Sequence, residues 1–231
     1  MIRGLYAAAS GMKALSIQQD VTARNLAHAN KPGFRRQILT FESFVKRDAH
    51  LGVQVERVND FTVGDPQFTQ RELDVALTGD GFFVLDGPNG PLYTRSGVFQ
   101  VNAQGQLITM DGFPVQGVAG PITAPPLTEH FSILDNGIVL ADGQQVGQLR
   151  IVQFTDNNRL TRAGNTLFRA PNDLPPQPSP TEVRQGYRER SNGPMVLEMV
   201  NMIDGLRHYE AAQKALTSLS DVIQLSTRPQ G

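Results

Sequence analysis

The chain has 231 residues, of which 39% are apolar, so it can bury the core of one large domain or two modest ones. Its 21 basic and 22 acidic side chains give a formal charge of −1, which argues against a nucleic-acid partner. It has no cysteine, which excludes disulfides and thiolate metal sites, and no run reaches the roughly 18 apolar residues of a membrane span, so we expect no direct membrane insertion.

The first predicted element is a long helix over residues 3–29. Apolar or small side chains recur there at alternating steps of three and four residues, which is the spacing of a coiled-coil seam. Alanines between them favour a helix and leave room for close approach by another helix. The predicted seam positions in this helix are Leu5, Ala8, Met12, Leu15 and Leu26.

Several stop signals end this helix within the stretch NLAHANKPGF (25–34). Asn30 tolerates the left-handed conformation that closes a helix, and Pro32 has no backbone N–H to continue one. Pro32 and Gly33 also suit the two central positions of a type II turn. We therefore predict an exit turn that comprises Asn25, Asn30, Pro32, Gly33 and Phe34.

The middle of the chain reads as extended and β-rich. Residues 31–73 are expected to form an extended connector, in which FESFVKR (41–47) would be a short amphipathic turn. Residues 74–186 are expected to form a central antiparallel β domain, sandwich- or barrel-like. Tight-turn pairs separate its short apolar runs; they are Asp80-Gly81, Asn89-Gly90, Asp111-Gly112, Asn136-Gly137 and Asp142-Gly143.

The β domain also contains a faint internal echo. LYTRSGVF (92–99) and LTRAGNTLF (160–168) share Thr-Arg, a glycine and a phenylalanine. Two similar hairpins would explain the echo, and chance reuse of turn residues explains it equally well.

The last segment, residues 187–231, repeats the helical pattern of the first. Its predicted helix over 194–227 would be about 50 Å long at 1.5 Å per residue, and it would pack with residues 1–30 in a coiled-coil-like layer. Its predicted seam positions are Met195, Met199, Met202, Leu206, Tyr209, Leu216 and Ile223. The fold class is therefore α+β, in four parts: 1–30, 31–73, 74–186 and 187–231.

A heptad pattern shows a seam without showing its partner. An intramolecular hairpin of the two terminal helices is one interpretation, and packing between molecules is the other. Residues off the seam, such as Val21, Val196, Val200 and Ile203, give each helix a second apolar stripe. Two wide apolar faces favour a bundle or the wall of a polymer.

No residue pattern points to an enzyme. The four histidines lack metal-ligand spacing and a nucleophile setting, and GDG (79–81) precedes an apolar β run rather than a helix. We expect no catalytic residue, no cofactor and no metal.

Three blocks in order resemble the rod and hook proteins of the bacterial flagellum. The first is NLAHANKPGFR, in which His28 replaces the second asparagine of the usual motif. The second spans 71–109 and the third begins at Ser191. The matching positions in the second and third blocks are Leu73, Asp74, Gly81, Phe82, Phe83, Arg95, Gly97, Phe99, Ser191, Asn192, Glu198, Arg207, Glu210 and Lys214.

The resemblance implies a structural subunit of the basal-body rod in the periplasmic space. Members of the family polymerise through their terminal helices with themselves and related axial proteins, and the type III apparatus exports them without a cleaved signal peptide. NKPGFRR, GVAGPITAP (117–125) and the short linker before Tyr187 resemble proximal rod proteins more than distal ones. An alternative of another class is a glycan- or cell-wall-binding β module dimerised by its helices.

Overall fold

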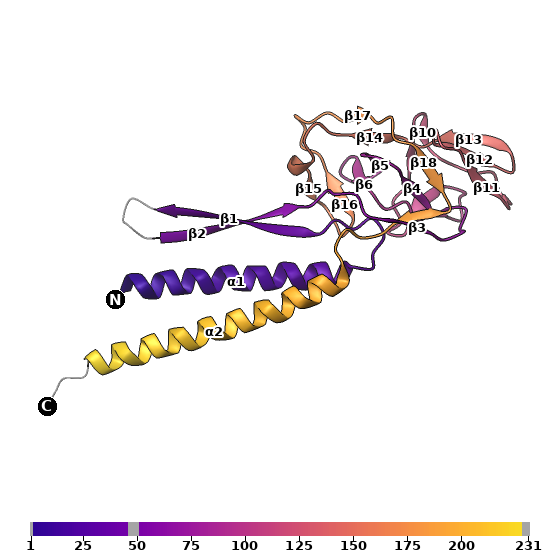
Figure 1. Ribbon diagram of the computed structural model, residues 1–231. Helices are drawn as coiled ribbons and strands as arrows, with labels where there is room; N and C mark the ends of the chain where they lie inside the picture. The colour runs from indigo at the N-terminus through magenta and orange to yellow at the C-terminus, as the bar shows by residue number, and fades with distance from the viewer. Residues whose placement is uncertain (1, 46–50, 228–231) are drawn as a thin grey trace. The chain divides into compact units, whose positions relative to one another are not determined.

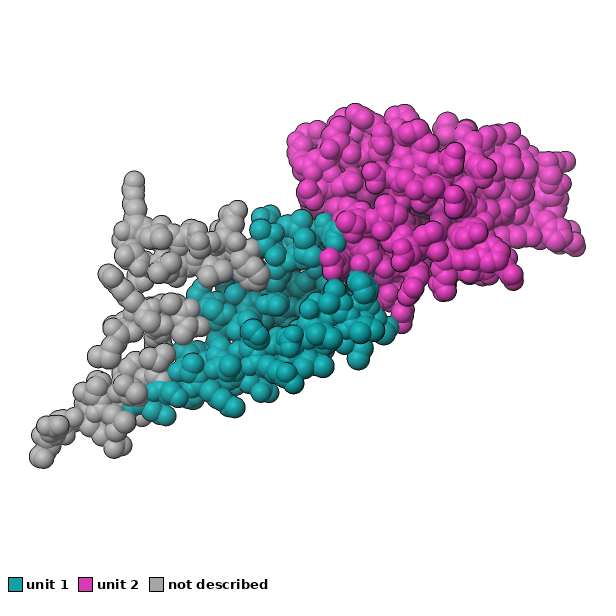
Figure 2. All heavy atoms as spheres, viewed as in Figure 1, with its two compact units in different colours: residues 1–27, 37–60, 193–231 teal, residues 28–36, 61–192 magenta. Residues whose placement is uncertain are grey.

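The computed structural model describes residues 2–45 and 51–227, which form two long helices and a set of short strands (Figure 1). The predicted α+β class is confirmed. The chain divides into two compact units, both discontinuous in sequence (Figure 2). The helical unit comprises residues 1–27, 37–60 and 193–231, and the β unit comprises residues 28–36 and 61–192. The backbone therefore passes between the units four times. The four-segment division expected above stays a prediction.

The helical unit contains α1 (Ile2–His28), α2 (Met195–Thr227) and a hairpin of β1 (Gln37–Val45) and β2 (Leu51–Asn59). The hairpin is antiparallel, and its register runs from Gln37 opposite Asn59 to Val45 opposite Leu51. The expectation of a short amphipathic turn at 41–47 is therefore wrong for residues 41–45, because they belong to strand β1. Residues 46–50, which hold no Asn-Gly or Asp-Gly pair, lie outside the described residues.

Few side chains of the helical unit are buried. Among the described side chains of α1, the buried ones are Ala14, Val21, Thr22 and Asn25. On α2, Gly205 lies against α1, because a Cβ at this position would lie 2.8 Å from Gln19 Oε1. A side chain at position 205 would therefore require the Gln19 side chain to move.

The β unit is built from small antiparallel sheets. The largest has six strands in the order β15-β16-β6-β5-β14-β17, and a three-stranded sheet has the order β11-β12-β13. Four two-stranded pairs complete it: β3–β19, β4–β18, β7–β8 and β9–β10. No sheet among the described strands closes into a barrel, and the sandwich-like alternative stays a prediction.

The bounds of these strands are β3 (Pro66–Phe68), β4 (Val75–Leu77), β5 (Phe82–Leu85), β6 (Leu92–Thr94), β7 (Phe99–Val101), β8 (Leu107–Thr109), β9 (Gln116–Gly117), β10 (Gly120–Pro121), β11 (Phe131–Ile133), β12 (Ile138–Ala141), β13 (Gln144–Gln148), β14 (Ile151–Gln153), β15 (Thr161–Arg162), β16 (Leu167–Arg169), β17 (Gln177–Pro178), β18 (Val183–Gln185) and β19 (Tyr187–Glu189); a 3₁₀ turn, η1, spans Asn157–Arg159.

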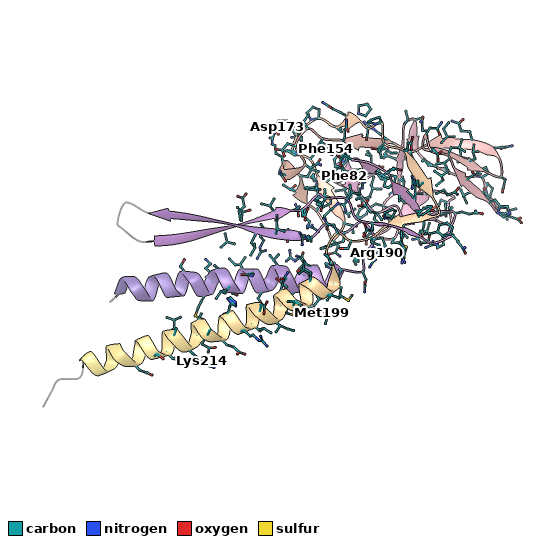
Figure 3. The ribbon with its side chains drawn as sticks, viewed as in Figure 1. Phe82, Phe154, Asp173, Arg190, Met199 and Lys214 are labelled. Atoms are coloured by element: carbon teal, nitrogen blue, oxygen red, sulfur yellow. The ribbon has the colours of Figure 1, made fainter. Side chains whose placement is uncertain are left out.

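Strand β5 supplies both cores of the β unit, because successive side chains of a strand point to opposite faces. Phe83 and Leu85 belong to one buried cluster, and Phe82 and Val84 belong to the other. In the second cluster the rings of Phe82 and Phe154 are 6.0 Å apart (Figure 3). The continuous apolar run FFVL thus follows from a strand that is covered on both faces.

The glycines of the five tight-turn pairs all have positive φ, from 80° at Gly137 to 153° at Gly81. At Asp142-Gly143 both residues have positive φ, 47° and 81°, and they join β12 to β13. Positive φ at two successive residues is the requirement of a type I′ hairpin.

Candidate functional site

The segment that follows α1 folds into the β unit as a tight turn. Lys31 N donates to His28 O at 2.9 Å, and Phe34 N donates to Lys31 O at 3.2 Å. Gly33 has φ of +68°, and a Cβ on it would lie 2.3 Å from the backbone nitrogen of Ser96. Glycine is required here twice, by the backbone conformation and by the closeness of another chain segment.

The ring of Phe34 is completely buried beside the turn. The Arg162 guanidinium lies over it at 5.0 Å and over the Phe168 ring at 5.2 Å, which is cation–π distance. Arg162 Nη2 also donates to Arg35 O at 2.5 Å. A single side chain therefore holds both the ring and the backbone of the exit segment.

One buried carboxylate ties the exit segment to two other parts of the chain. Glu189 Oε1 accepts from Arg35 Nη2 at 2.5 Å, and Oε2 accepts from Arg95 Nε at 2.6 Å. The side chains of all three residues are 2% exposed. Gly64 N donates to Glu189 Oε1 at 2.8 Å, and Gly33 N donates to Glu189 O at 2.8 Å. We call Arg35, Arg95 and Glu189 the buried triad.

Arg95 extends the triad into the core of the β unit. Its Nη1 donates to Gly81 O at 2.6 Å, and its Nη2 donates to Gly79 O. Two residues further on, Gly97 passes so close to Val75 that a Cβ would lie 1.8 Å from Val75 O. Arg95 of the TRSG stretch thus holds the backbone of the GDG stretch.

Asn192 joins the exit segment to the chain that leads into α2. Its Oδ1 accepts from Arg36 N at 2.8 Å, and its Nδ2 donates to Thr62 O at 3.1 Å. With Glu189, it fixes the place where the chain enters and leaves the β unit.

A separate polar contact fixes the base of the helical unit. The Asn25 side chain makes two hydrogen bonds with the backbone of Gln37. Asn25 Nδ2 donates to Gln37 O at 2.8 Å, and Gln37 N donates to Asn25 Oδ1 at 2.9 Å. Its Nδ2 also lies 3.5 Å from Glu198 Oε1. Asn25 and Glu198 are both 3% exposed, so this buried contact joins α1, the start of β1 and α2.

The apolar positions of α2 lie largely at the surface. The exposed ones are Met195, Val196, Leu197, Met199, Val200, Ile203, Leu206 and Tyr209, and Figure 3 labels Met199 among them. We call this set the α2 apolar surface. Met12, Leu15, Leu26, Met202 and Leu216 are half-buried, and the side chains of Leu5, Ala8 and Ile223 lie outside the described residues.

The remaining motif residues fall into two groups. Asp74, Phe82, Phe83 and Phe99 are buried in the β unit, and Leu73 packs against its first core cluster. Arg207, Glu210 and Lys214 are exposed on α2, and Ser191 is half-buried just before it. Asn30 is exposed and Pro32 is half-buried in the exit turn.

Sequence reasoning missed Glu189 and Arg162. The internal echo was the available signal, because its two Thr-Arg pairs contain Arg95 and Arg162. Arg162 bonds the exit segment directly, and Arg95 bonds Glu189, which holds that segment. No corresponding pattern marks Glu189.

Over the residues that the structure describes, no group of three His, Cys, Asp or Glu side chains could hold a metal ion. No helix within the same residues is long and apolar enough to cross a membrane.

Three family descriptions match the chain. Residues 5–35 match "Flagella basal body rod protein", residues 76–141 match "Flagellar hook protein FlgE/F/G D1 domain", and residues 184–228 match "Flagellar basal body rod FlgEFG protein C-terminal". The first and third matches end or begin at the segments that meet in the buried triad.

Curated relatives are similar over nearly their whole length. Flagellar basal-body rod protein FlgG of Bacillus subtilis (strain 168) is 30% identical over 97% of each chain. Flagellar basal-body rod protein FlgF of Salmonella typhimurium (strain LT2) is 34% identical over 96% of this chain and 95% of its own. The FlgF protein of Caulobacter vibrioides is 30% identical over 96% and 95%, respectively.

We expect Glu189→Gln to lower the free energy of unfolding of the β unit by about 3–5 kcal/mol. The substitution keeps the shape of the side chain and leaves two buried guanidinium charges without their counter-ion. Urea unfolding followed by circular dichroism measures the change. Asp173→Asn is the control, because it breaks an ion pair with Arg159 at the surface, and its midpoint should not move. Equal midpoints for Glu189→Gln and the unsubstituted chain would contradict a stabilising triad.

A comparison of the stability lost in Gly33→Ala with that lost in Gly112→Ala separates the cost of a steric clash from the cost of backbone strain. Both glycines have positive φ, but a Cβ at Gly112 meets nothing within 4 Å. Strain alone costs about 1–2 kcal/mol, and the overlap with Ser96 should make Gly33→Ala costlier by roughly 2 kcal/mol or more. The same urea titration gives both values. A similar cost for the two variants would show that the segment does not lie against Ser96.

Proposed function

The chain belongs to the flagellar basal-body rod protein family, and on this premise we propose that it polymerises into the rod through its two terminal helices. The structural role in the basal-body rod comes with the family. The proposal adds that α1 and α2 pair in a coiled-coil-like layer in the assembled state, at the predicted seam. We expect no enzymatic activity, as is general for structural proteins of this kind.

The observation that carries the proposal is the α2 apolar surface. Its side chains range from 37% exposed at Tyr209 to 74% at Val196. A monomer rarely leaves so many large apolar side chains uncovered on one element unless they meet a partner. A helix whose apolar residues extend around most of its circumference needs several neighbours, which a polymer wall supplies.

The buried triad and Asn192 also support the proposal, because they fix the segments that connect the helices to the β unit. Subunits in a regular polymer must present the same surfaces in the same way. Both helices are joined to the β unit by short segments. Within that unit a buried ion pair and a partly buried hydrogen bond hold those segments. We propose that the exit turn sets where the N-terminal seam helix ends.

We favour the proximal rod over the distal rod. NKPGFRR, GVAGPITAP and the short linker before Tyr187 support this choice, whereas the similar proteins carry both the FlgF and the FlgG names. The distal rod is the alternative. The proposal includes export by the flagellar type III apparatus, a periplasmic location, and contacts with copies of this chain and with related axial proteins.

Complementation separates the two rod positions. Expressed in one host, the chain should restore swimming to a strain that lacks the proximal rod protein and leave a strain that lacks the distal one non-motile. The reverse pattern would assign it to the distal rod.

Leu206→Asp tests the α2 apolar surface. Leu206 is 47% exposed, so the aspartate stays hydrated in the monomer and is buried without a partner only on assembly, at a cost of about 3–5 kcal/mol. We expect unchanged unfolding of the monomer and loss of swimming in complemented cells. His208→Asp adds the same carboxylate two residues away, at an exposed polar position. Cells complemented with this control variant should still swim. Normal swimming of Leu206→Asp would show that this surface stays in water.

A further inference from the structure

A pocket in the β unit, far in sequence from the exit turn, lies among four separate segments. It has a volume of about 510 Å³, which is within the range of small-molecule sites. The residues that matter for its chemistry are Phe68, Gln70, Glu72, His130, Phe131 and Gln185. None of them takes part in the buried triad or belongs to the α2 apolar surface.

One residue that lines this pocket has a strained backbone. Three non-glycine residues in the described part of the chain have positive φ: Gln70 at 63°, Leu127 at 68° and Asp142 at 47°. Of these, only Gln70 lines the pocket. Asp142 has the positive φ of the β12–β13 hairpin turn, and its side chain accepts from His130 N at 3.0 Å. Strained residues of this kind cluster at ligand-binding sites, where the strain is kept for function.

An aromatic ring stands open at the pocket. Phe68 is 58% exposed, and its ring packs against the Tyr187 ring with 5.0 Å between centroids. The Phe68 ring is thus supported by contact with Tyr187 and remains largely exposed to solvent. A large exposed aromatic side chain that adds little to the core is a common feature of binding sites.

Polar groups with fixed positions face the same space. Glu72 Oε2 accepts from Phe131 N at 2.8 Å, and Glu72 Oε1 lies 3.2 Å from His130 Nδ1. The bond from Phe131 and the neighbouring His130 hold the pKa of Glu72 below its ordinary value, so the carboxylate is charged at neutral pH. Gln185 Nε2 donates to Glu72 O at 2.8 Å and to Phe131 O at 2.7 Å, which leaves the amide oxygen of Gln185 to accept from a ligand.

These contacts disfavour a peptide that would add as a strand. β11 is an edge strand of its sheet, but the side chains of Glu72 and Gln185 already bond both the N–H and the carbonyl of Phe131. An incoming strand needs those backbone groups. The open ring and the side-chain donors and acceptors remain available.

We propose that this pocket binds an oligosaccharide. A sugar ring would lay its C–H face on Phe68, and its hydroxyl groups would bond Glu72, His130 and the amides of Gln70 and Gln185. This combination of an aromatic platform with a few oriented polar groups suits a ligand that is apolar on its faces and polar at its edge. The inference does not depend on the rod assignment, because it uses no residue of the helices.

Saturation-transfer NMR and calorimetry on the full chain test the proposal with cellotetraose and chitotetraose as probes. We expect millimolar or tighter binding of at least one probe, weakened about tenfold or more by Phe68→Ala. Met110→Ala is the matched control, since Met110 is 64% exposed and does not line the pocket, and it should bind within about twofold of the unsubstituted chain. Absence of binding for both probes, or equal binding by Phe68→Ala, would overturn the proposal.

A second variant distinguishes a ligand site from a merely structural turn. Glycine adopts positive φ freely, so Gln70→Gly should fold at least as well by circular dichroism and still bind the sugar more weakly, through loss of the amide. If Gln70→Gly binds as tightly as the unsubstituted chain, the strained glutamine has no part in recognition. If Phe68→Ala instead changes self-association in sedimentation velocity with no sugar effect, the pocket is a contact between copies and the saccharide proposal fails.

Discussion

The organisation of this protein depends on one carboxylate that is removed from water and shared by two arginines. Glu189 contacts Arg35 at the end of the N-terminal segment, Arg95 in the core of the β unit, and Gly64 just after the hairpin. A buried ion pair contributes little net stability compared with apolar packing, but it strongly penalises arrangements that separate its partners. The triad therefore specifies which segments meet, while the two apolar clusters provide most of the stabilisation.

The elements were largely predictable because their signals are local. Each long helix was expected within two residues of its observed bounds, and the apolar β run expected after GDG (79–81) forms strand β5. The β1–β2 hairpin was missed because no tight-turn pair separates its strands, and its alternating pattern is weak. The central residue of the candidate site could not be predicted, because Arg35 and Glu189 are 154 residues apart and only the fold makes a pair of them.

The helical unit and the β unit bury their apolar side chains in different ways. The β unit buries phenylalanines on both faces of β5 and needs no partner for its cores. The helical unit has few buried side chains and a polar contact at Asn25, and it leaves the α2 apolar surface in water. Its remaining burial is supplied, on our proposal, by neighbouring subunits, so its stability and its assembly are the same process.

The four passages of the backbone between the units have a mechanical meaning. A domain joined through one linker transmits a twist only as well as its surface contacts hold. Here the chain crosses between the units at 27–28, 36–37, 60–61 and 192–193. A torque applied to the helices would reach the β unit through four backbone connections that share the load. Rotation of one unit against the other would therefore require all four connections to bend together, rather than rotation about one bond.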